Sequence, residues 1–287
     1  MEMILSAISQ GSLWAIMGFG VFLSFRVLKQ ADLTIESSFT LGAAVGVQSI
    51  CFGVHPILSL LISFLAGMAA GALTGLLITK GNIQPLLAGI ITMTGLYSVN
   101  LKYMGRANLS LSGEFTFKEL LHVYSLGRNM DTLLLGLSLC LLIIYFLSYF
   151  FKTQMGQALI ATGDNIHVAR SLGIQTDEMK MLGMMLANGF VALSGNLVAQ
   201  DNGYVDIGMG TGTVVIGLAA VIIGEALFKN VSLNKRMVTI VFGSIFYRLL
   251  LSFVLILKFD PNDFKLFSAF ILSLCLIVPN LGRRKKG

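Results

Sequence analysis

The side chains that most often perform chemistry in proteins are few in this chain, and they are scattered. The three histidines and three cysteines do not share the short spacings of a metal site. An intramembrane enzyme would need a nucleophile, a base or a metal that converge, and Ser194 with the scattered histidines offers no such set. We therefore predict no catalytic residue, no cofactor and no metal site.

Nucleotide binding by the common phosphate loop is also not expected. The sequence contains no Gly-Lys pair, so the pattern G-x-x-x-x-G-K-[ST] is absent. The glycine-rich segment from Gly208 to Gly212 resembles such a loop superficially but lacks the lysine. We interpret it as a helix start or the corner of a broken helix.

A second group of polar residues lies inside, or at the edge of, apolar stretches, where polar side chains are costly and usually face a cavity or a neighbouring helix. These candidates for a solute pathway are Ser38, Thr40, Gln84, Thr92, Asn100, Asn188, Asn196 and Arg248. Asn188 and Asn196 lie on one face of a helix, given their spacing. For each uncharged candidate, a hydrogen bond between helices is the commoner explanation.

Arg248 stands out because it falls near the middle of an apolar run. An uncompensated arginine at the centre of a bilayer costs at least about 2.5–3.5 kcal/mol. The side chain therefore needs a partner or a water-filled cavity. A structural ion pair or extension of the side chain to an interface is the commoner explanation, and a substrate carboxylate is the alternative.

The elements that position these residues are long apolar runs. The chain is 55% hydrophobic and 12% charged, whereas about a quarter of a soluble domain is charged. Runs such as 56–79 and 132–151 approach the roughly 20 residues that cross the hydrocarbon core. Backbone amides in lipid must be paired within the chain, so we expect helices. The runs are too long and too uniformly apolar for barrel strands. The fold class is predicted to be an all-α integral membrane protein.

We predict nine transmembrane helices, near residues 3–25, 33–53, 57–79, 83–103, 132–151, 181–200, 212–228, 237–257 and 265–281. A cytoplasmic basic tail, 282–287, places 13 of the 20 lysines and arginines on the cytoplasmic side, as the positive-inside rule requires. The N-terminus is then outside a bacterial plasma membrane. The polar start of the 33–53 segment suggests a partial or broken helix.

An internal similarity suggests two inverted repeats within a single transmembrane domain. The segment from Gln10 to Gly18 resembles that from Asn188 to Gly195, and segments that begin at Asp32 and Asp206 follow. Five predicted spans separate the copies, and an odd number reverses the orientation. We expect repeats at about 1–103 and 181–281, joined by 104–180. Chance similarity among glycine-rich and alanine-rich helices is the alternative.

Smaller features of the two repeats carry their own expectations. Asp32 and Asp206 are expected to cap the spans that follow them. The glycine ladder Gly67, Gly71 and Gly75 should let two helices pack closely.

The most informative segment is the loop 152–180, which we expect on the cytoplasmic side. Asp164 or Asn165 can cap a helix that follows, and Gly173 is suited to end it. A short capped helix parallel to the membrane can dock a soluble partner. Arg170 is the expected anchor, because its guanidinium group makes several hydrogen bonds.

This loop resembles the coupling motif of bacterial ABC importer permeases, in the branch that serves branched-chain amino acids and ribose. The expected coupling residues are Gly156, Ala158, Gly163, Asp164, Asn165, Ala169, Arg170 and Gly173. The segments 33–44 and 217–224 also look like family signatures. The resemblance covers essentially the whole chain.

The resemblance implies a type II-like permease without its own ATP site. A separate cytoplasmic ATPase subunit would bind ATP and Mg, and its closure would switch the pore between outward- and inward-facing states. An extracellular or periplasmic binding protein would deliver the solute. A second permease copy, expected to be identical, would complete the pore. The expected solute is an amino acid, branched-chain or aromatic.

Alternatives remain open. A self-contained secondary transporter would also tolerate an inverted repeat, but such carriers usually place a carboxylate within a span, and the acids here cluster at span ends. A sugar-type or nucleoside-type ABC permease would share the coupling loop. Nucleic acid is not an expected partner, because the basic residues lie at span ends.

Overall fold

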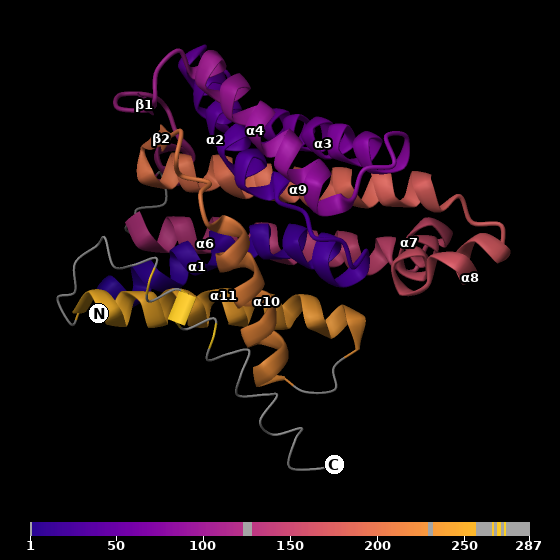
Figure 1. Ribbon diagram of the computed structural model, residues 1–287. Coiled ribbons are helices and arrows are strands. Elements are labelled where there is room, and N and C mark those ends of the chain that lie inside the picture. The colour runs from indigo at the N-terminus through magenta and orange to yellow at the C-terminus, as the bar shows by residue number, and fades with distance from the viewer. Residues whose placement is uncertain are drawn as a thin grey trace.

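The computed structural model describes residues 2–122, 128–228 and 232–256, together with Leu266, Ala269, Phe270 and Ser273. These residues form eleven α-helices, one π-helix and two short strands. Most of the long helices lie side by side in one bundle, with α7 and α8 at one end and the strands at the other (Figure 1).

Five helices of the described residues are long and apolar enough to cross a membrane, and each lies at a predicted span. They are α1 (Glu2–Val21), which continues into the π-helix η1 (Phe22–Val27), α3 (Pro56–Thr79), α6 (Arg128–Phe150), α9 (Thr176–Asn202) and α11 (Leu233–Ile256). The predicted all-α membrane architecture is therefore confirmed in outline.

Three further predicted spans are helices that are shorter or more polar: α2 (Thr34–Cys51), α4 (Pro85–Met104) and α10 (Thr213–Leu227). The 15 residues of α10 cover only about 22 Å, against roughly 30 Å of hydrocarbon. The ninth predicted span, 265–281, lies outside the described residues except for four positions. The count of nine and the inverted repeat stay predictions.

Helix α2 is enclosed by its neighbours, and nearly all of its side chains are buried. The Ser37 hydroxyl donates to the Met93 carbonyl of α4, 2.7 Å away. The ring of Phe39 stacks on Trp14 of α1, with 5.1 Å between centroids. A helix surrounded by protein need not be apolar all round, which explains why α2 carries more polar residues than a lipid-facing span.

The predicted glycine ladder on α3 is confirmed as a close helix contact. Gly67 and Gly71 face the backbone of α9, where a Cβ atom would overlap the carbonyl oxygens of Asn188 and Met184. Helices α3 and α9 accordingly run side by side (Figure 1). Small residues are what permit such an approach within a membrane.

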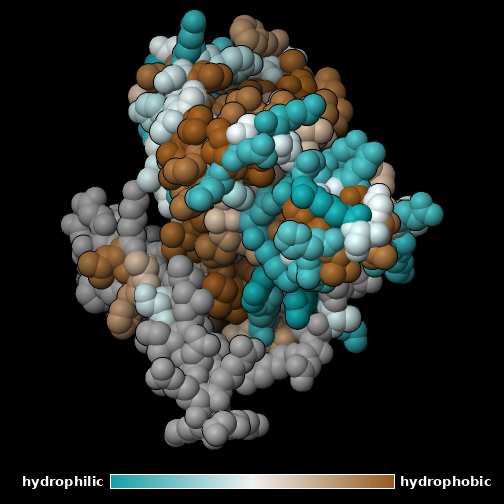
Figure 2. Space-filling model, turned by 45° about the vertical axis from the view of Figure 1, so that its right-hand side comes forward, coloured by the Kyte–Doolittle hydropathy of each residue, from teal (hydrophilic) through white to brown (hydrophobic). Residues whose placement is uncertain are grey.

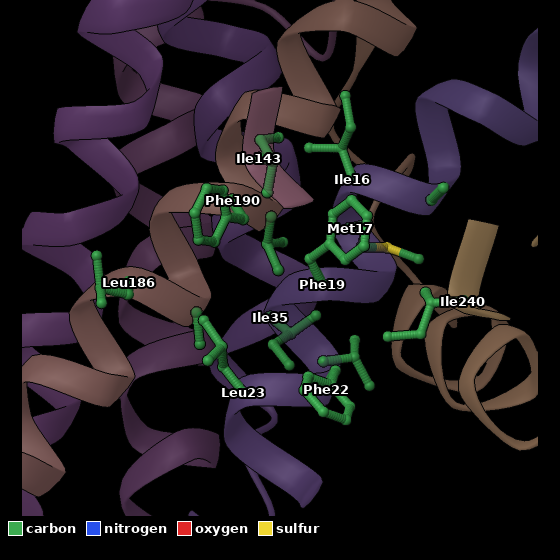
Figure 3. Packing of buried hydrophobic residues seen from close by; sticks show 14 of the residues in the cluster. Ile16, Met17, Phe19, Phe22, Leu23, Ile35, Ile143, Leu186, Phe190 and Ile240 are labelled. Carbon is green, nitrogen blue, oxygen red and sulfur yellow. The ribbon is translucent and has the colours of Figure 1, made fainter. Parts of the chain in front are cut away.

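The largest apolar core lies where α1 meets its neighbours. Figure 3 shows side chains from several helices meeting there, among them Met17 and Phe19 of α1, Ile35 of α2, Ile143 of α6, Phe190 of α9 and Ile240 of α11. All six are buried. Because α1 contacts so many helices, its C-terminal end can influence several of them.

The end of the bundle opposite α7 and α8 is covered by two short strands and a short helix. Strand β1 (Asn108–Ser110) pairs antiparallel with β2 (Tyr204–Asp206). Helix α5 (Phe117–His122) follows β1 in the chain. The Phe117 amide donates to Gln200 Oε1 at 3.1 Å, and Lys118 Nζ lies 3.0 Å from Asp201 Oδ1. These contacts fasten the connection between α4 and α6 to the end of α9.

Candidate functional site

Two short helices, α7 (Gln154–Asp164) and α8 (Ile166–Ser171), join α6 to α9. Thr153 begins α7, where its hydroxyl accepts from the Gly156 amide at 3.2 Å. Asn165 begins α8, where its Oδ1 accepts from the amides of His167 and Val168 at 3.0 and 3.3 Å. The predicted cap at Asn165 is confirmed. Helix α7 was not predicted, although Thr153 is a recognisable capping signal.

Gly173 ends α8, as predicted from its type. Its φ of 81° lies in the left-handed region that favours glycine. The Ile174 amide then donates to the Ala169 carbonyl at 3.1 Å, so a carbonyl at the end of the helix is satisfied. The chain turns sharply here and enters α9.

The other small residues of the motif pack inward. A Cβ atom at Gly156 would overlap the Phe150 carbonyl, and one at Gly163 would overlap the Val27 carbonyl. Ala169 is buried, and Ala158 packs against the core. The small residues of the motif therefore allow α7 and α8 to pack closely against the ends of α6, α9 and η1.

The outer side of α8 exposes apolar residues. Val168 is 52% and Leu172 71% exposed, and His167 is exposed beside them. Figure 2 turns this end of the molecule forward and shows hydrophilic residues gathered there, with hydrophobic ones between them. Exposed apolar residues rimmed by polar ones are typical of a protein-binding surface.

Arg170 and Asp164 contact their own chain. Arg170 Nε donates to Thr176 Oγ1 at 3.0 Å, and its Nη2 lies 3.4 Å from Asp177 Oδ1. Asp164 Oδ1 accepts from Lys29 Nζ at 2.8 Å. Arg170 thus ties α8 to the first turn of α9, and its expected role as an anchor for a partner stays a prediction.

Asn188 lies in a buried network beside the start of α2. Its Nδ2 donates to Asp32 Oδ2 at 2.8 Å, and its Oδ1 accepts from the Ser38 hydroxyl at 2.7 Å. Asp32 Oδ1 also accepts from the Thr34 amide at 2.9 Å, so Asp32 satisfies the first amide of α2 from one residue before the N-cap position, which is Leu33. No ion-pair partner of Asp32 occurs among the described residues. Its carboxylate is held by hydrogen bonds instead.

Asn196 belongs to a second buried network on the same face of α9. Its Nδ2 donates to the hydroxyls of Ser63 and Ser59, at 2.9 and 3.2 Å. Gln200 Nε2 donates to Asn196 Oδ1 at 3.0 Å. Both asparagines therefore make hydrogen bonds between helices, which is the commoner explanation weighed from the sequence.

The candidates on α4 lie apart from these networks. Asn100 Nδ2 donates to the Ser37 carbonyl at 3.1 Å. Asn100 Oδ1 and Thr92 Oγ1 are buried and have no hydrogen-bond partner in the part of the chain that the structure describes. Gln84 is exposed at the beginning of α4.

The expectation that Asp206 caps the following span is wrong. Its Oδ1 accepts from the Gly208 amide at 2.8 Å, within a turn that precedes α10. The N-terminus of α10 instead meets Glu36 of α2, whose Oε1 accepts from the Gly212 amide at 3.0 Å. Thr40 lies one turn further along α2. Glu36 was not among the predicted site residues, although it is an acidic residue in the first turn of a predicted span.

Arg248 contacts an aromatic ring. Its guanidinium carbon lies 4.7 Å from the centroid of Trp14, which is a cation–π geometry. Trp14 stacks on Phe39 in turn. Arg248 Nε has no hydrogen-bond partner within the described ranges. The partner that the sequence required is therefore an aromatic ring in α1.

Comparison with known proteins places this arrangement in a family. Residues 3–278 match the family described as branched-chain amino acid transport system, permease component. The tyrosine transport system permease protein of Clostridioides difficile (strain R20291) is 36% identical, over 98% of this chain and 92% of that protein. The ribose import permease protein RbsC of Escherichia coli (strain K12) is 24% identical, over 76% and 67%.

Solved structures agree on the fold. PsaBC from Streptococcus pneumoniae in complex with Fab has a TM-score of 0.52 at 16% sequence identity, over 95% of this chain and 89% of that chain. An inward-facing metal-chelate type ABC transporter has a TM-score of 0.51 at 18% identity. The chain is a membrane protein that belongs to the permease family of the branched-chain amino acid transport system, a family of ABC importer permeases.

Proposed function

We propose that this chain forms the translocation pathway of an ABC importer for an amino acid. An external binding protein would deliver the solute, and a separate ATPase subunit would bind ATP and Mg. The observation that supports this best is the pair α7 and α8. Its small residues are seated against the bundle, while Val168 and Leu172 are exposed beyond it.

The proposal fixes an orientation. The end with α7 and α8 faces the cytoplasm, so β1 and β2 lie outside, with the beginning of α1 on their side (Figure 1). Lys29, Lys80 and Lys152 follow helices that end on the cytoplasmic side in this arrangement, in keeping with the positive-inside rule.

The packing of the helices supports the two inverted halves. Helix α3 packs on α9 of the other half, and α11 packs on α1. Within each half, α2 packs on α3 and α10 packs on α11. We propose that the halves, about 1–103 and 181–281, move relative to each other as the pathway opens. A second, identical copy would complete the pore.

The proposed solute is an aromatic amino acid such as tyrosine. The support is the 36% identity to a tyrosine transport permease over nearly the whole chain. A sugar is the second candidate, because ribose and autoinducer 2 import permeases also match, at lower identity and coverage.

The docking proposal is tested by capture of the ATPase. Val168→Asp places a charge on the exposed face of α8 without disturbing its caps. We expect the variant to insert normally, to lose the ATPase on co-purification and to lose tyrosine uptake in proteoliposomes. Tyr204→Asp is the matched control, since Tyr204 is 45% exposed at the opposite end. Normal capture by Val168→Asp would reject α8 as the docking element.

The solute is tested in the same proteoliposomes. Uptake of labelled tyrosine should be blocked by unlabelled tyrosine and phenylalanine but not by ribose. Uptake of ribose with no uptake of tyrosine would show that the solute is a sugar and not an amino acid. The docking proposal would be unaffected.

A further inference from the structure

The segment between α1 and α2 departs from regular helix. The Leu28 amide donates to the Leu23 carbonyl at 2.9 Å, and the Gln30 amide donates to the Ser24 carbonyl at 2.9 Å. The π-helix η1 that results is a rare conformation and is frequently found at functional sites. Lys29 follows with a φ of 55°, which is strained for a residue other than glycine. Strain of this kind persists only where the surroundings hold the chain.

One side of this segment is held by α7. The Val27 carbonyl lies directly against Gly163, where a Cβ atom would not fit. Lys29 Nζ pairs with Asp164 Oδ1 at 2.8 Å. The Leu28 side chain reaches Gly183 of α9 next to Leu159 of α7. A displacement of α7 would therefore press on η1 without any intervening element.

The other side is held by α10. Arg26 Nε donates to Glu225 Oε1 at 3.0 Å, and Arg26 Nη2 donates to Glu225 Oε2. Such a fork fixes both groups in one relative orientation. Arg236 Nη1 of α11 lies 3.9 Å from Glu225 Oε1, so Glu225 connects η1 to both α10 and α11. The Arg26 side chain is half-exposed, and exposed pairs add little to stability. The geometry suits positioning rather than stabilisation.

We propose that η1 transmits the movement of α7 and α8 to α10, and that Arg26 and Glu225 are the positioning residues of this step. The inference rests on the proposed function, because it needs an ATPase that moves the coupling helices. The same shift would reach α2, since Asp32 lies three residues after Lys29 and accepts a hydrogen bond from the first amide of that helix, at Thr34. One strained segment would thus act on one helix of each half, α2 and α10, both of which are continuous helices.

The experiment compares neutral variants in the complete complex, reconstituted in proteoliposomes with the ATPase and the binding protein. The variants are Arg26→Gln, Glu225→Gln, the double variant and the conservative Arg26→Lys. Lys80→Gln is the matched control, an exposed cation at the same end of the bundle. The readouts are solute uptake, ATP hydrolysis and co-purification of the ATPase.

Each single variant should lower uptake per ATP hydrolysed about tenfold, within the usual range of coupling between sites, while the ATPase stays bound. The double variant should lower uptake per ATP no further than the more affected single variant, because each single variant already removes the contact between Arg26 and Glu225. Arg26→Lys should keep most of the wild-type uptake per ATP hydrolysed, and Lys80→Gln should keep all of it.

The inference fails if both single variants keep the wild-type ratio, if their losses multiply in the double variant, or if they only release the ATPase. These outcomes differ from failure of the proposed function. In that case the wild-type complex itself would not couple ATP hydrolysis to uptake.

Discussion

Asn188 shows how a polar residue is accommodated inside the membrane bundle. Its amide satisfies Asp32 on one side and Ser38 on the other, so a single side chain joins α9 to both the start and the first turns of α2. Asp32 is buried, and the donors around it replace the water that a carboxylate would otherwise require.

Asn188→Ala should therefore destabilise the protein. It removes one donor from Asp32 and leaves Ser38 without its acceptor, and a buried group left unsatisfied costs about 1–3 kcal/mol. We expect a lower midpoint of thermal unfolding in detergent. Thr94→Ala is the control, since Thr94 is exposed and bonds only to carbonyls of its own helix. Equal midpoints for the two variants would show that the network carries no stability.

At the scale of elements, α8 depends on its caps. It has six residues, and an isolated helix of that length is not stable in water. Asn165 and Gly173 define its ends, and Arg170 ties it to α9. The docking surface exists only while this short helix is held together.

Asn165→Ala should weaken docking while leaving Val168 and Leu172 unchanged. Loss of an N-cap costs about 0.5–2 kcal/mol, so the affinity for the ATPase should fall by several-fold. Asn165→Asp and Asn165→Ser can still cap and should keep most of it. Binding of the purified ATPase to the detergent-solubilised permease measures the difference. If alanine and aspartate gave the same affinity, the cap would have no role in docking.

The elements also show what a sequence can reveal. Long apolar runs place α3 and α6 correctly, because length and hydropathy decide whether a helix can span lipid. The contact between Glu36 and Gly212 was missed, since it joins residues 176 apart in the chain. Helix α7 is short and amphipathic, so length and hydropathy do not predict it, and Thr153 is the local signal that marks its beginning. Local chemistry is readable from sequence, whereas partners across the bundle are set by packing.

At the scale of the whole molecule, orientation decides every functional assignment. The same bundle inserted upside down would place α8 outside, where no ATP is available. The protein has three cysteines, and Cys140 is buried. Their replacement by alanine or serine therefore gives a background in which one introduced thiol reports on one position.

In that background His167→Cys should react with a membrane-impermeant maleimide only from the cytoplasmic side, in inside-out vesicles. Asn108→Cys, in β1 at the opposite end, should react in intact cells. Both positions are exposed in the chain itself, so in a permease expressed without the ATPase their accessibility differs only through the side of the membrane. Reaction of His167→Cys in intact cells would show that the bundle has the opposite orientation in the membrane. That result would reject both the proposed docking surface and the proposed route from α7 through η1 to α10, because both require α8 to lie beside the ATPase.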